Sequence, residues 1–141
     1  MTIYKRRRGT AIVETSKGIL LVAGRSKLFI LPGGGAEKDE TRTEAAIREL
    51  REETGLIANY SKVLFRYIGS VHKSHSGGFF RDYHTVCLIK ADGIPRPKHE
   101  IRYVEFYVPA DTASELKISR NTKEIIDIFY ESKNEYLTYK G

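Results

Sequence analysis

The chain has 141 residues, 40% of them hydrophobic, and a formal net charge of +6, which fits one compact domain with its own core. A single cysteine, Cys87, excludes an internal disulfide and suits a reducing compartment. No run reaches the roughly 18 apolar residues of a membrane-spanning helix, and Glu14 interrupts the apolar stretch after the basic N-terminus, which excludes a signal peptide. We expect one cytoplasmic domain over residues 1–141.

The N-terminal segments alternate between strand-like stretches and turns. Apolar and β-branched residues predict strands at Thr10–Glu14, Ile19–Ala23 and Leu28–Ile30, with a turn at 16–18 between the first two. The run Lys5–Arg8 precedes the first strand. Such a run attracts RNA or polyphosphate, or else is a solvated, frayed terminus, and the sequence leaves both interpretations open.

A helix is predicted after a glycine-rich turn. Thr41 is a good N-cap, Glu44 completes a capping box, and Gly55 stands where helices commonly end. At about 100° per residue, three glutamates share one side of this helix. They are Glu49, Glu52 and Glu53. Arg48 precedes Glu52 by one helical turn, so we expect an ion pair between them.

The second half of the chain also contains both strand-like and helical segments. Strands are expected at Tyr60–Val71, Arg81–Lys90 and Tyr103–Val108, and a helix with an apolar stripe is expected to begin near Asn121. Strands interleaved with two helices predict an α/β fold, a mixed β-sheet sandwiched between α-helices.

The glycine turn and the acidic helix together indicate a chemical site. The turn, Leu31–Gly35, permits close backbone approach, and clustered carboxylates are the ligands that hard divalent cations prefer. This combination is typical of a place where metal ions meet phosphate. The alternative is a solvated acidic face, but such a face needs neither the glycine turn before it nor the glycine stop after it.

The segment from Gly34 to Leu56 resembles a known family motif. It reads Gly-x5-Glu-x7-Arg-Glu-Leu-x-Glu-Glu-x-Gly-Leu and matches the box of the Nudix (MutT-like) hydrolases. One departure is Asp39, which stands where many members have glycine. The resemblance implies a Nudix fold and hydrolysis of a nucleoside diphosphate linked to another moiety.

The resemblance also implies roles for individual residues. It implies a Mg²⁺ or Mn²⁺ ion held by the carboxylates of Glu49, Glu52 and Glu53, with the carbonyl of Gly33 as a further ligand. Glu40 would be a structural acid of the loop and Arg48 an orienting partner of the carboxylates. In similar proteins a later loop supplies a ligand or the catalytic base. We therefore keep two candidates for the base, Glu49 and Glu100.

Residues that contact the substrate are harder to predict. Arg25 follows the second strand and is positioned to reach phosphates as a bidentate donor. The backbone of Gly34 and Gly35 allows close approach of a ligand. In the segment 72–83, Phe80 either stacks on a base or packs within a hairpin.

The substrate class is predicted mainly by exclusion. Val71 stands where ADP-ribose hydrolases of this family often carry proline, and His72 and Lys73 stand where dinucleoside polyphosphate hydrolases often carry tyrosine. This favours a nucleoside triphosphate, oxidised ones included. The alternatives are an RNA 5′-end pyrophosphohydrolase, an ADP-ribose or dinucleoside polyphosphate hydrolase, and a non-catalytic nucleotide sensor. We expect a monomer or a homodimer without a membrane partner.

Overall fold

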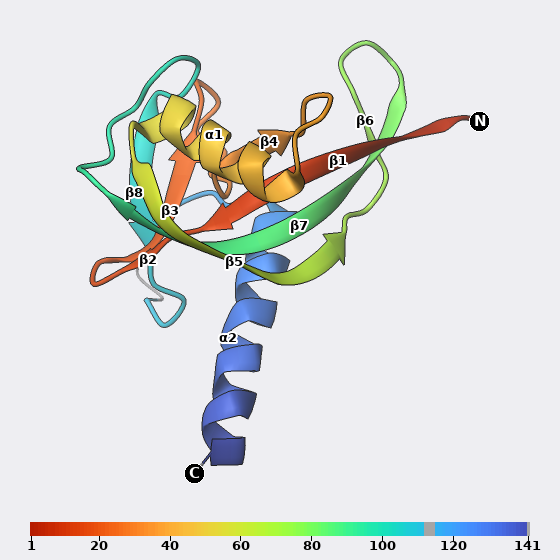
Figure 1. Cartoon of the computed structure of the whole chain (residues 1–141). Helices are drawn as coiled ribbons and strands as arrows, with labels where there is room; N and C mark the ends of the chain where they lie inside the picture. The colour runs from red at the N-terminus through yellow and green to blue at the C-terminus, as the bar shows by residue number, and fades with distance from the viewer. Residues whose placement is uncertain (112–114, 141) are drawn as a thin grey trace.

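The computed structural model describes the backbone of residues 1–111 and 115–140 and the side chains up to Lys133. Its strands are β1 (Ile3–Ile12), β2 (Glu14–Thr15), β3 (Gly18–Ala23), β4 (Gly33–Gly35), β5 (Ile57–Ile68), β6 (His72–Lys73), β7 (Phe79–Asp92) and β8 (Tyr103–Tyr107). The helices are α1 (Arg42–Thr54) and α2 (Arg120–Lys140), as Figure 1 shows. The predicted mixed α/β fold is confirmed.

The strands are divided between two sheets. The larger one runs in the order β4-β1-β7-β5, with β6 paired to the end of β7, and the smaller one runs β2-β3-β8. In the larger sheet β1 and β7 are parallel, whereas β4 and β5 are antiparallel to their neighbours, so the sheet is mixed. The sequence predicted the longer strands approximately, but neither the short strands β4 and β6 nor the division of the strands between two sheets.

Strand β1 begins earlier than predicted. It starts at Ile3, paired with Phe79, and continues to Ile12, paired with Leu88. The basic run Lys5–Arg8 is therefore part of the central pairing, and the interpretation as a frayed terminus is wrong. A run of cationic side chains gives little local signal for a strand. The strand forms here through pairing with β7, which lies more than 70 residues away in the sequence.

The loop between β3 and α1 also differs from the prediction. The segment Leu28–Ile30 is not a named strand, since Phe29 and Ile30 make only isolated bridges to Ile118 and Val22. Instead the glycine turn supplies the short strand β4, in which Thr10 pairs with Gly33. Three consecutive glycines carry no strand propensity, and their pairing depends on the adjacent β1.

The larger sheet is covered on both faces. On one face Ala11 and Cys87 belong to a core cluster with Leu50 of α1. On the other, Ile12 and Val86 belong to a cluster with the apolar stripe of α2. Adjacent strand residues point to opposite faces, which explains the division. Among the described residues no helix is long and apolar enough to cross a membrane.

Gly9 allows α1 to lie close to the sheet. A Cβ atom added at this position would lie 1.9 Å from the carbonyl oxygen of Arg42 and 2.6 Å from the backbone nitrogen of Ala46. Only glycine fits this contact, and α1 is thereby fixed against β1 near the glycines of β4.

Candidate functional site

Helix α1 begins and ends as the sequence predicts. The Thr41 hydroxyl accepts a hydrogen bond from the backbone N–H of Glu44, and the Glu44 carboxylate accepts one from the N–H of Thr41, both at 3.1 Å. Gly55 adopts the left-handed conformation with φ of 80°. Both ends of the helix are fixed, so the carboxylates between them are presented from a rigid element.

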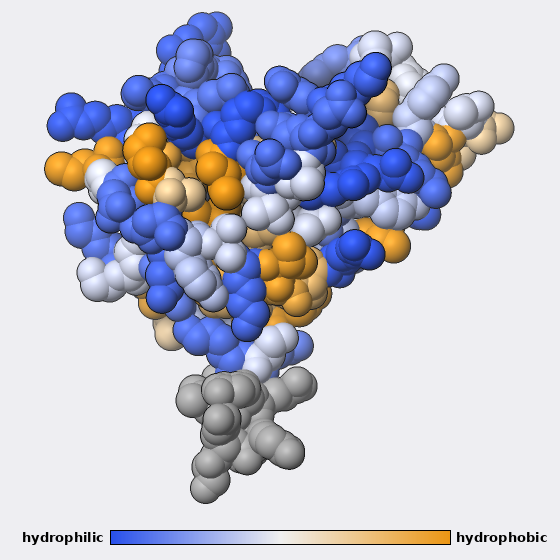
Figure 2. Space-filling view, in the orientation of Figure 1, coloured by the Kyte–Doolittle hydropathy of each residue, from blue (hydrophilic) through white to orange (hydrophobic). Residues whose placement is uncertain are grey.

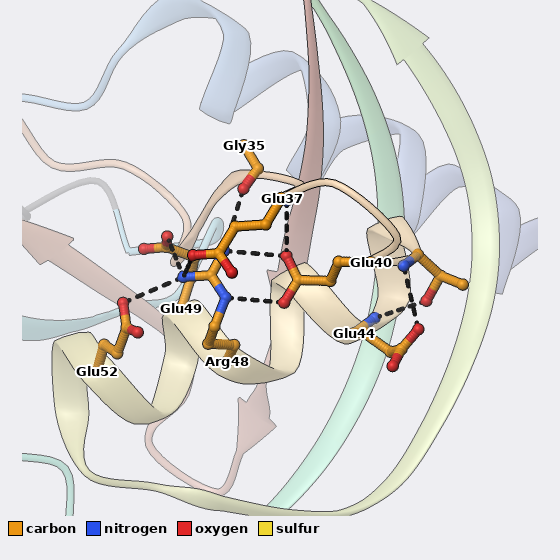
Figure 3. Close-up of polar contacts among 8 residues, drawn as sticks. Gly35, Glu37, Glu40, Glu44, Arg48, Glu49 and Glu52 are labelled. Atoms are coloured by element: carbon orange, nitrogen blue, oxygen red, sulfur yellow. Dashed lines mark hydrogen bonds and ion pairs between the residues drawn. The ribbon is translucent and has the colours of Figure 1, made fainter.

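Arg48 lies at the centre of a polar network on α1 (Figure 3). Its Nε and Nη2 atoms donate to the two carboxylate oxygens of Glu40 at 2.8 and 3.1 Å. Its Nη1 donates to Glu49 at 2.9 Å and to Glu52 at 3.2 Å. The predicted ion pair with Glu52 is confirmed, but the bidentate contact with Glu40 is the tighter one. Arg48 therefore orients several carboxylates at once.

Glu40 stabilises the loop that leads into α1. In addition to its pairing with Arg48, it accepts a hydrogen bond from the N–H of Glu37 at 2.9 Å. These contacts with Arg48 and the Glu37 backbone hold the pKa of the Glu40 carboxyl below its usual value. The preceding Asp39 has φ of 66°, a conformation that glycine adopts readily and aspartate tolerates. The departure from the family motif thus keeps the loop geometry.

Glu53 is a buried carboxylate beside the glycine turn. Its side chain accepts a hydrogen bond from the N–H of Gly33 at 3.0 Å, and only 4% of the residue is exposed. Burial, aided by the nearby carboxylates of Glu49 and Glu100, raises the pKa of Glu53 to about 8, although the hydrogen bond from Gly33 and the charge of Arg8 act to lower it. A bound cation would favour the charged form of a buried carboxyl that has acidic neighbours.

Glu49 lies directly against the glycines of β4. A Cβ atom at Gly34 would lie 2.6 Å from the Glu49 carboxyl carbon, whereas one at Gly35 would meet nothing within 4 Å. Glu52 is more open, with 47% of its side chain exposed. The three glutamates of the motif therefore range from buried to exposed along one side of α1.

The loop after β7 brings Glu100 toward the same carboxylates. Lys98 donates from its backbone N–H to the carbonyl of Glu53 at 3.1 Å, and Arg96 donates likewise to Thr54 at 3.0 Å. Both bonds attach this loop to the C-terminal end of α1. Glu100 itself is exposed, two residues after this attachment.

A hollow of about 400 Å³ lies on the α2 side of the larger sheet. Its polar lining includes Arg8, Asp82 and His84 from the strands and Asn121 and Thr122 from α2. Within the described part of the chain, Arg8 Nε and His84 Nε2 are buried side-chain atoms without a hydrogen-bond partner. Buried polar atoms are normally paired, so these two favour a bound ligand.

Comparison with known proteins agrees with this geometry. Residues 4–130 match the NUDIX domain. The chain belongs to the Nudix family. A putative nudix hydrolase from Chromobacterium violaceum is 30% identical, with a TM-score of 0.70 over 99% of this chain and 90% of that one. A MutT Nudix hydrolase from Burkholderia pseudomallei has a TM-score of 0.67 at 21% identity, over 87% and 96% of the two chains, which shows a shared fold.

Curated relatives match over shorter segments. An ADP-ribose pyrophosphatase from Methanocaldococcus jannaschii is 42% identical over 60 residues, 40% of this chain and 36% of that protein. Human nucleoside diphosphate-linked moiety X motif 6 is 33% identical over 88 residues, 58% of this chain. The chain spans 26% of the length of this human relative.

The Nudix carboxylates fit a hard divalent cation by their chemistry. All of the donors are oxygens, and Glu53 combines burial with acidic neighbours. In the described residues no three histidine, cysteine, aspartate or glutamate side chains converge closely enough to form a complete metal cluster. Instead Glu49 and Glu52 are turned toward Arg48, and Glu53 toward Gly33.

Two predicted substrate contacts, Arg25 and Phe80, are not among the residues that line the hollow on the α2 side. Arg25 is exposed and follows Gly24, where a Cβ atom would lie 3.4 Å from the carbonyl oxygen of Glu100. Phe80 lies at the start of β7, with its ring centroid 5.7 Å from that of Tyr4 and 5.0 Å from the Arg6 guanidinium. These contacts give Phe80 a packing role, and base stacking by it stays a prediction.

The hollow on the α2 side is difficult to predict from sequence. In the sequence Arg8 is one member of a run of cations, and no local pattern marks Asp82 or His84 as site residues. The signal that would identify them is the alternation along β1 and β7, which places Arg8, Asp82 and His84 on the same face. That signal requires knowledge of the parallel pairing between the two strands.

Proposed function

We propose that this Nudix protein is a metal-dependent pyrophosphohydrolase that cleaves a nucleoside triphosphate to the monophosphate and pyrophosphate. The carboxylates of Glu49, Glu52 and Glu53 and the carbonyl of Gly33 would hold Mg²⁺ or Mn²⁺. When bound, such a cation neutralises phosphate charge and makes phosphorus more susceptible to attack by water.

The single observation that carries this proposal is the environment of Glu53. The Glu53 carboxyl is 4% exposed, accepts a hydrogen bond from the glycine turn and is affected by the charges of Glu49 and Glu100, so its ionisation costs free energy that a bound cation would offset. A protein that only binds nucleotides gains nothing from mutually repelling carboxylates. The arrangement therefore supports catalysis over a sensor function.

The two arginines of the site, Arg48 and Arg8, have different roles. Arg48 holds Glu49 and Glu52 in orientation through its Nη1 atom, and its contacts to Glu40 keep it in place. Arg8 lines the hollow and lies near enough to Glu53 to affect the Glu53 pKa. It is placed to meet the phosphates of a nucleotide whose nucleoside occupies the hollow. Glu49 or Glu100 takes the proton from the attacking water.

ADP-ribose is the second candidate substrate. The 42% identity to an ADP-ribose pyrophosphatase over 60 residues favours it. Val71 in place of the frequent proline argues against it, so we rank it below a nucleoside triphosphate.

The test is hydrolysis of a substrate panel with Mg²⁺, with Mn²⁺ and with a chelator. The panel holds canonical and oxidised nucleoside triphosphates, ADP-ribose, a dinucleoside polyphosphate and RNA with a 5′-triphosphate. Separation of the products by ion chromatography distinguishes pyrophosphate from orthophosphate. We expect pyrophosphate from one triphosphate, and none with the chelator.

Two results would change the proposal. Cleavage of ADP-ribose at a higher kcat/KM than any triphosphate would move the assignment to the second candidate. Nucleotide binding without turnover in either metal would favour the sensor.

A further inference from the structure

A group of cations lies on the α1 face of the larger sheet, beyond the start of α1. The register pairs Lys5 with Arg81 and Arg7 with Tyr83 in the parallel strands β1 and β7. Residues paired side by side point to the same face, and the Lys5 ammonium lies 5.3 Å from the centroid of the Tyr83 ring. Arg42 and Arg66 add charges from α1 and β5. We call these five cations the outer basic patch.

The centre of the outer basic patch is a hollow of about 320 Å³. Arg7, Arg42 and Arg66 line it together with Tyr83 and Thr85, and none of the described residues in its lining carries a carboxylate. Figure 2 shows the strongly hydrophilic surface that covers β1 and β7 here, beside the start of α1. Three guanidinium groups around one concave surface form a good receptor for phosphate oxygens.

The charges of this patch are not neutralised by neighbouring acids. In the part of the chain that the structure describes, no carboxylate lies within ion-pair distance of Arg7, Arg42 or Arg66. By contrast, Arg6 on the opposite face of β1 pairs with Asp82 at 2.8 Å. The cations of the α1 face therefore repel one another, and binding of an anionic partner would relieve this repulsion.

Acidic groups do occur in the neighbouring hollow. Asp39 and Glu40 line it together with Arg42 and Arg66. Glu40 is already engaged by Arg48 through two hydrogen bonds. Among the described residues that line this hollow, Asp39 is thus the one acidic group not engaged by Arg48, and Arg42 with Arg66 outnumbers it, so the net charge stays positive.

The patch is separate from the hollow on the α2 side that is proposed to hold the nucleoside. Arg8 and Asp82, which line the other hollow, alternate with Arg7 and Tyr83 along their strands and so face the α2 side. The patch also extends across β1, β7 and β5, which lie about 4.8 Å apart, and along β1 by about 6.6 Å between Lys5 and Arg7. A single phosphate is smaller than this spread, whereas a chain of phosphates matches it.

We propose that the outer basic patch is a binding surface for the phosphate backbone of single-stranded nucleic acid. The cations contact successive phosphates, and Tyr83 with the exposed Ile68 offers apolar area to the bases. Contacts of this kind make binding insensitive to sequence and strongly dependent on salt. The proposal does not depend on the hydrolytic function.

The test is fluorescence anisotropy with a labelled 12-nucleotide single-stranded RNA that has a 5′-hydroxyl end, in the presence of a chelator. Neither a triphosphate nor a metal is present, so the catalytic site contributes no turnover. The test variant is Arg7→Ala with Arg66→Ala, since both residues are exposed and unpaired. The matched control is Arg51→Ala with Arg96→Ala, which removes the same charge from exposed positions outside the patch.

We expect the wild-type affinity to fall linearly with salt on logarithmic axes. The test variant should bind at least about tenfold more weakly at low salt, and its slope should be smaller by about 1.4, or roughly 0.7 for each lost phosphate contact. The control should keep the wild-type slope. Thermal unfolding and nucleotide hydrolysis by the test variant report separately on the fold and on the proposed function.

Three results would overturn the proposal. The first is an absence of RNA binding by the wild-type protein at low salt. The second is equal weakening in the test variant and the control, which would indicate an effect of net charge alone. The third is competition by tripolyphosphate as strong as that by the 12-nucleotide RNA, which would indicate a site for a small anion.

Discussion

The carboxylate of Glu53 on α1 accepts a hydrogen bond from the backbone N–H of Gly33 on β4 at 3.0 Å. The bond is buried and joins the glycine turn to the acidic helix. Burial favours the neutral form of this carboxyl, so its charged form is costly in the protein alone. A bound cation would favour the charged form. The same bond fixes the backbone of Gly33, whose carbonyl is a proposed metal ligand.

Replacement of Glu53 by glutamine should separate catalysis from folding. The amide keeps an oxygen that accepts from Gly33 but carries no negative charge for a cation. We expect kcat to fall by on the order of 100-fold or more, since loss of a metal ligand should exceed the 10- to 100-fold cost of disturbing its supports. Stability of the metal-free protein should be unchanged or higher, because the amide is neutral at every pH and the buried carboxyl with its cost of ionisation is removed. Steady-state kinetics and thermal unfolding measure the two effects.

Glu105→Gln is the matched control for this substitution, because Glu105 is an exposed glutamate on β8. It should keep wild-type kinetics. Full turnover by Glu53→Gln would show that Glu53 is not a metal ligand.

Adjacent glycines of β4 provide a second test. Gly34→Ala places a methyl group against the Glu49 carboxyl, at 2.6 Å from its carbon, and Glu49 must move. Gly35→Ala places the same group in open space. We expect Gly34→Ala to lower kcat about tenfold or more, as expected when a ligand is displaced. The decrease in kcat should be smaller for Gly35→Ala.

The kinetic pattern of the two glycine variants carries further information. A rise in KM confined to Gly35→Ala would support the prediction that substrate approaches this glycine. Equal losses of kcat in both variants would contradict the role assigned to Glu49.

The contrast between these glycines and α1 shows what local sequence can predict. The signals that specify α1, from Thr41 to Gly55, lie within one segment and depend on backbone groups a turn away. They were therefore found without knowledge of the fold. The strand pairing of Gly33 with Thr10 depends instead on a partner elsewhere in the chain, and the glycines themselves have no preference for a strand.

The same distinction explains the polar residues. Spacing predicted the pair of Arg48 with Glu52, four residues apart. It did not predict that Arg48 binds Glu40 more tightly, because that contact depends on how the loop folds back over the helix. The proximity of Arg8 and His84 could not be predicted at all, since they are brought together by the parallel pairing of β1 and β7.

Arg48→Lys should show that the shape of the guanidinium group matters as well as its charge. Arg48 donates to Glu40, Glu49, Glu52 and the carbonyl of Gly35. A lysine ammonium is a single point and cannot reproduce the bidentate contact together with the others. We expect kcat to fall about tenfold through misorientation of Glu49. Arg51→Lys, on the exposed side of the same helix, should leave kcat unchanged. Identical kinetics for the two variants would remove Arg48 from the positioning role.

His84 should make stability depend on pH in the acidic range. Burial, with Arg8 as the next cause, lowers the pKa of His84 from 6.5 to about 4 in the folded protein. As pH falls below 6.5, the unfolded chain takes up a proton that the folded chain does not accept until about pH 4. The free energy of unfolding therefore decreases between these pH values, by up to about 3 kcal/mol from this residue.

The pH dependence is tested by urea unfolding of wild type and His84→Asn at several pH values from 7 to 4. The asparagine amide can still meet the Thr10 hydroxyl, which lies 2.8 Å from His84 Nδ1, but it does not titrate. Other titrating groups contribute equally to both proteins, so the difference between the two curves isolates His84. We expect the variant to be less stable at pH 7 and the difference to shrink as pH falls. The exposed His75→Gln should follow the wild-type curve, and a constant offset for His84→Asn would mean that His84 titrates normally in the fold.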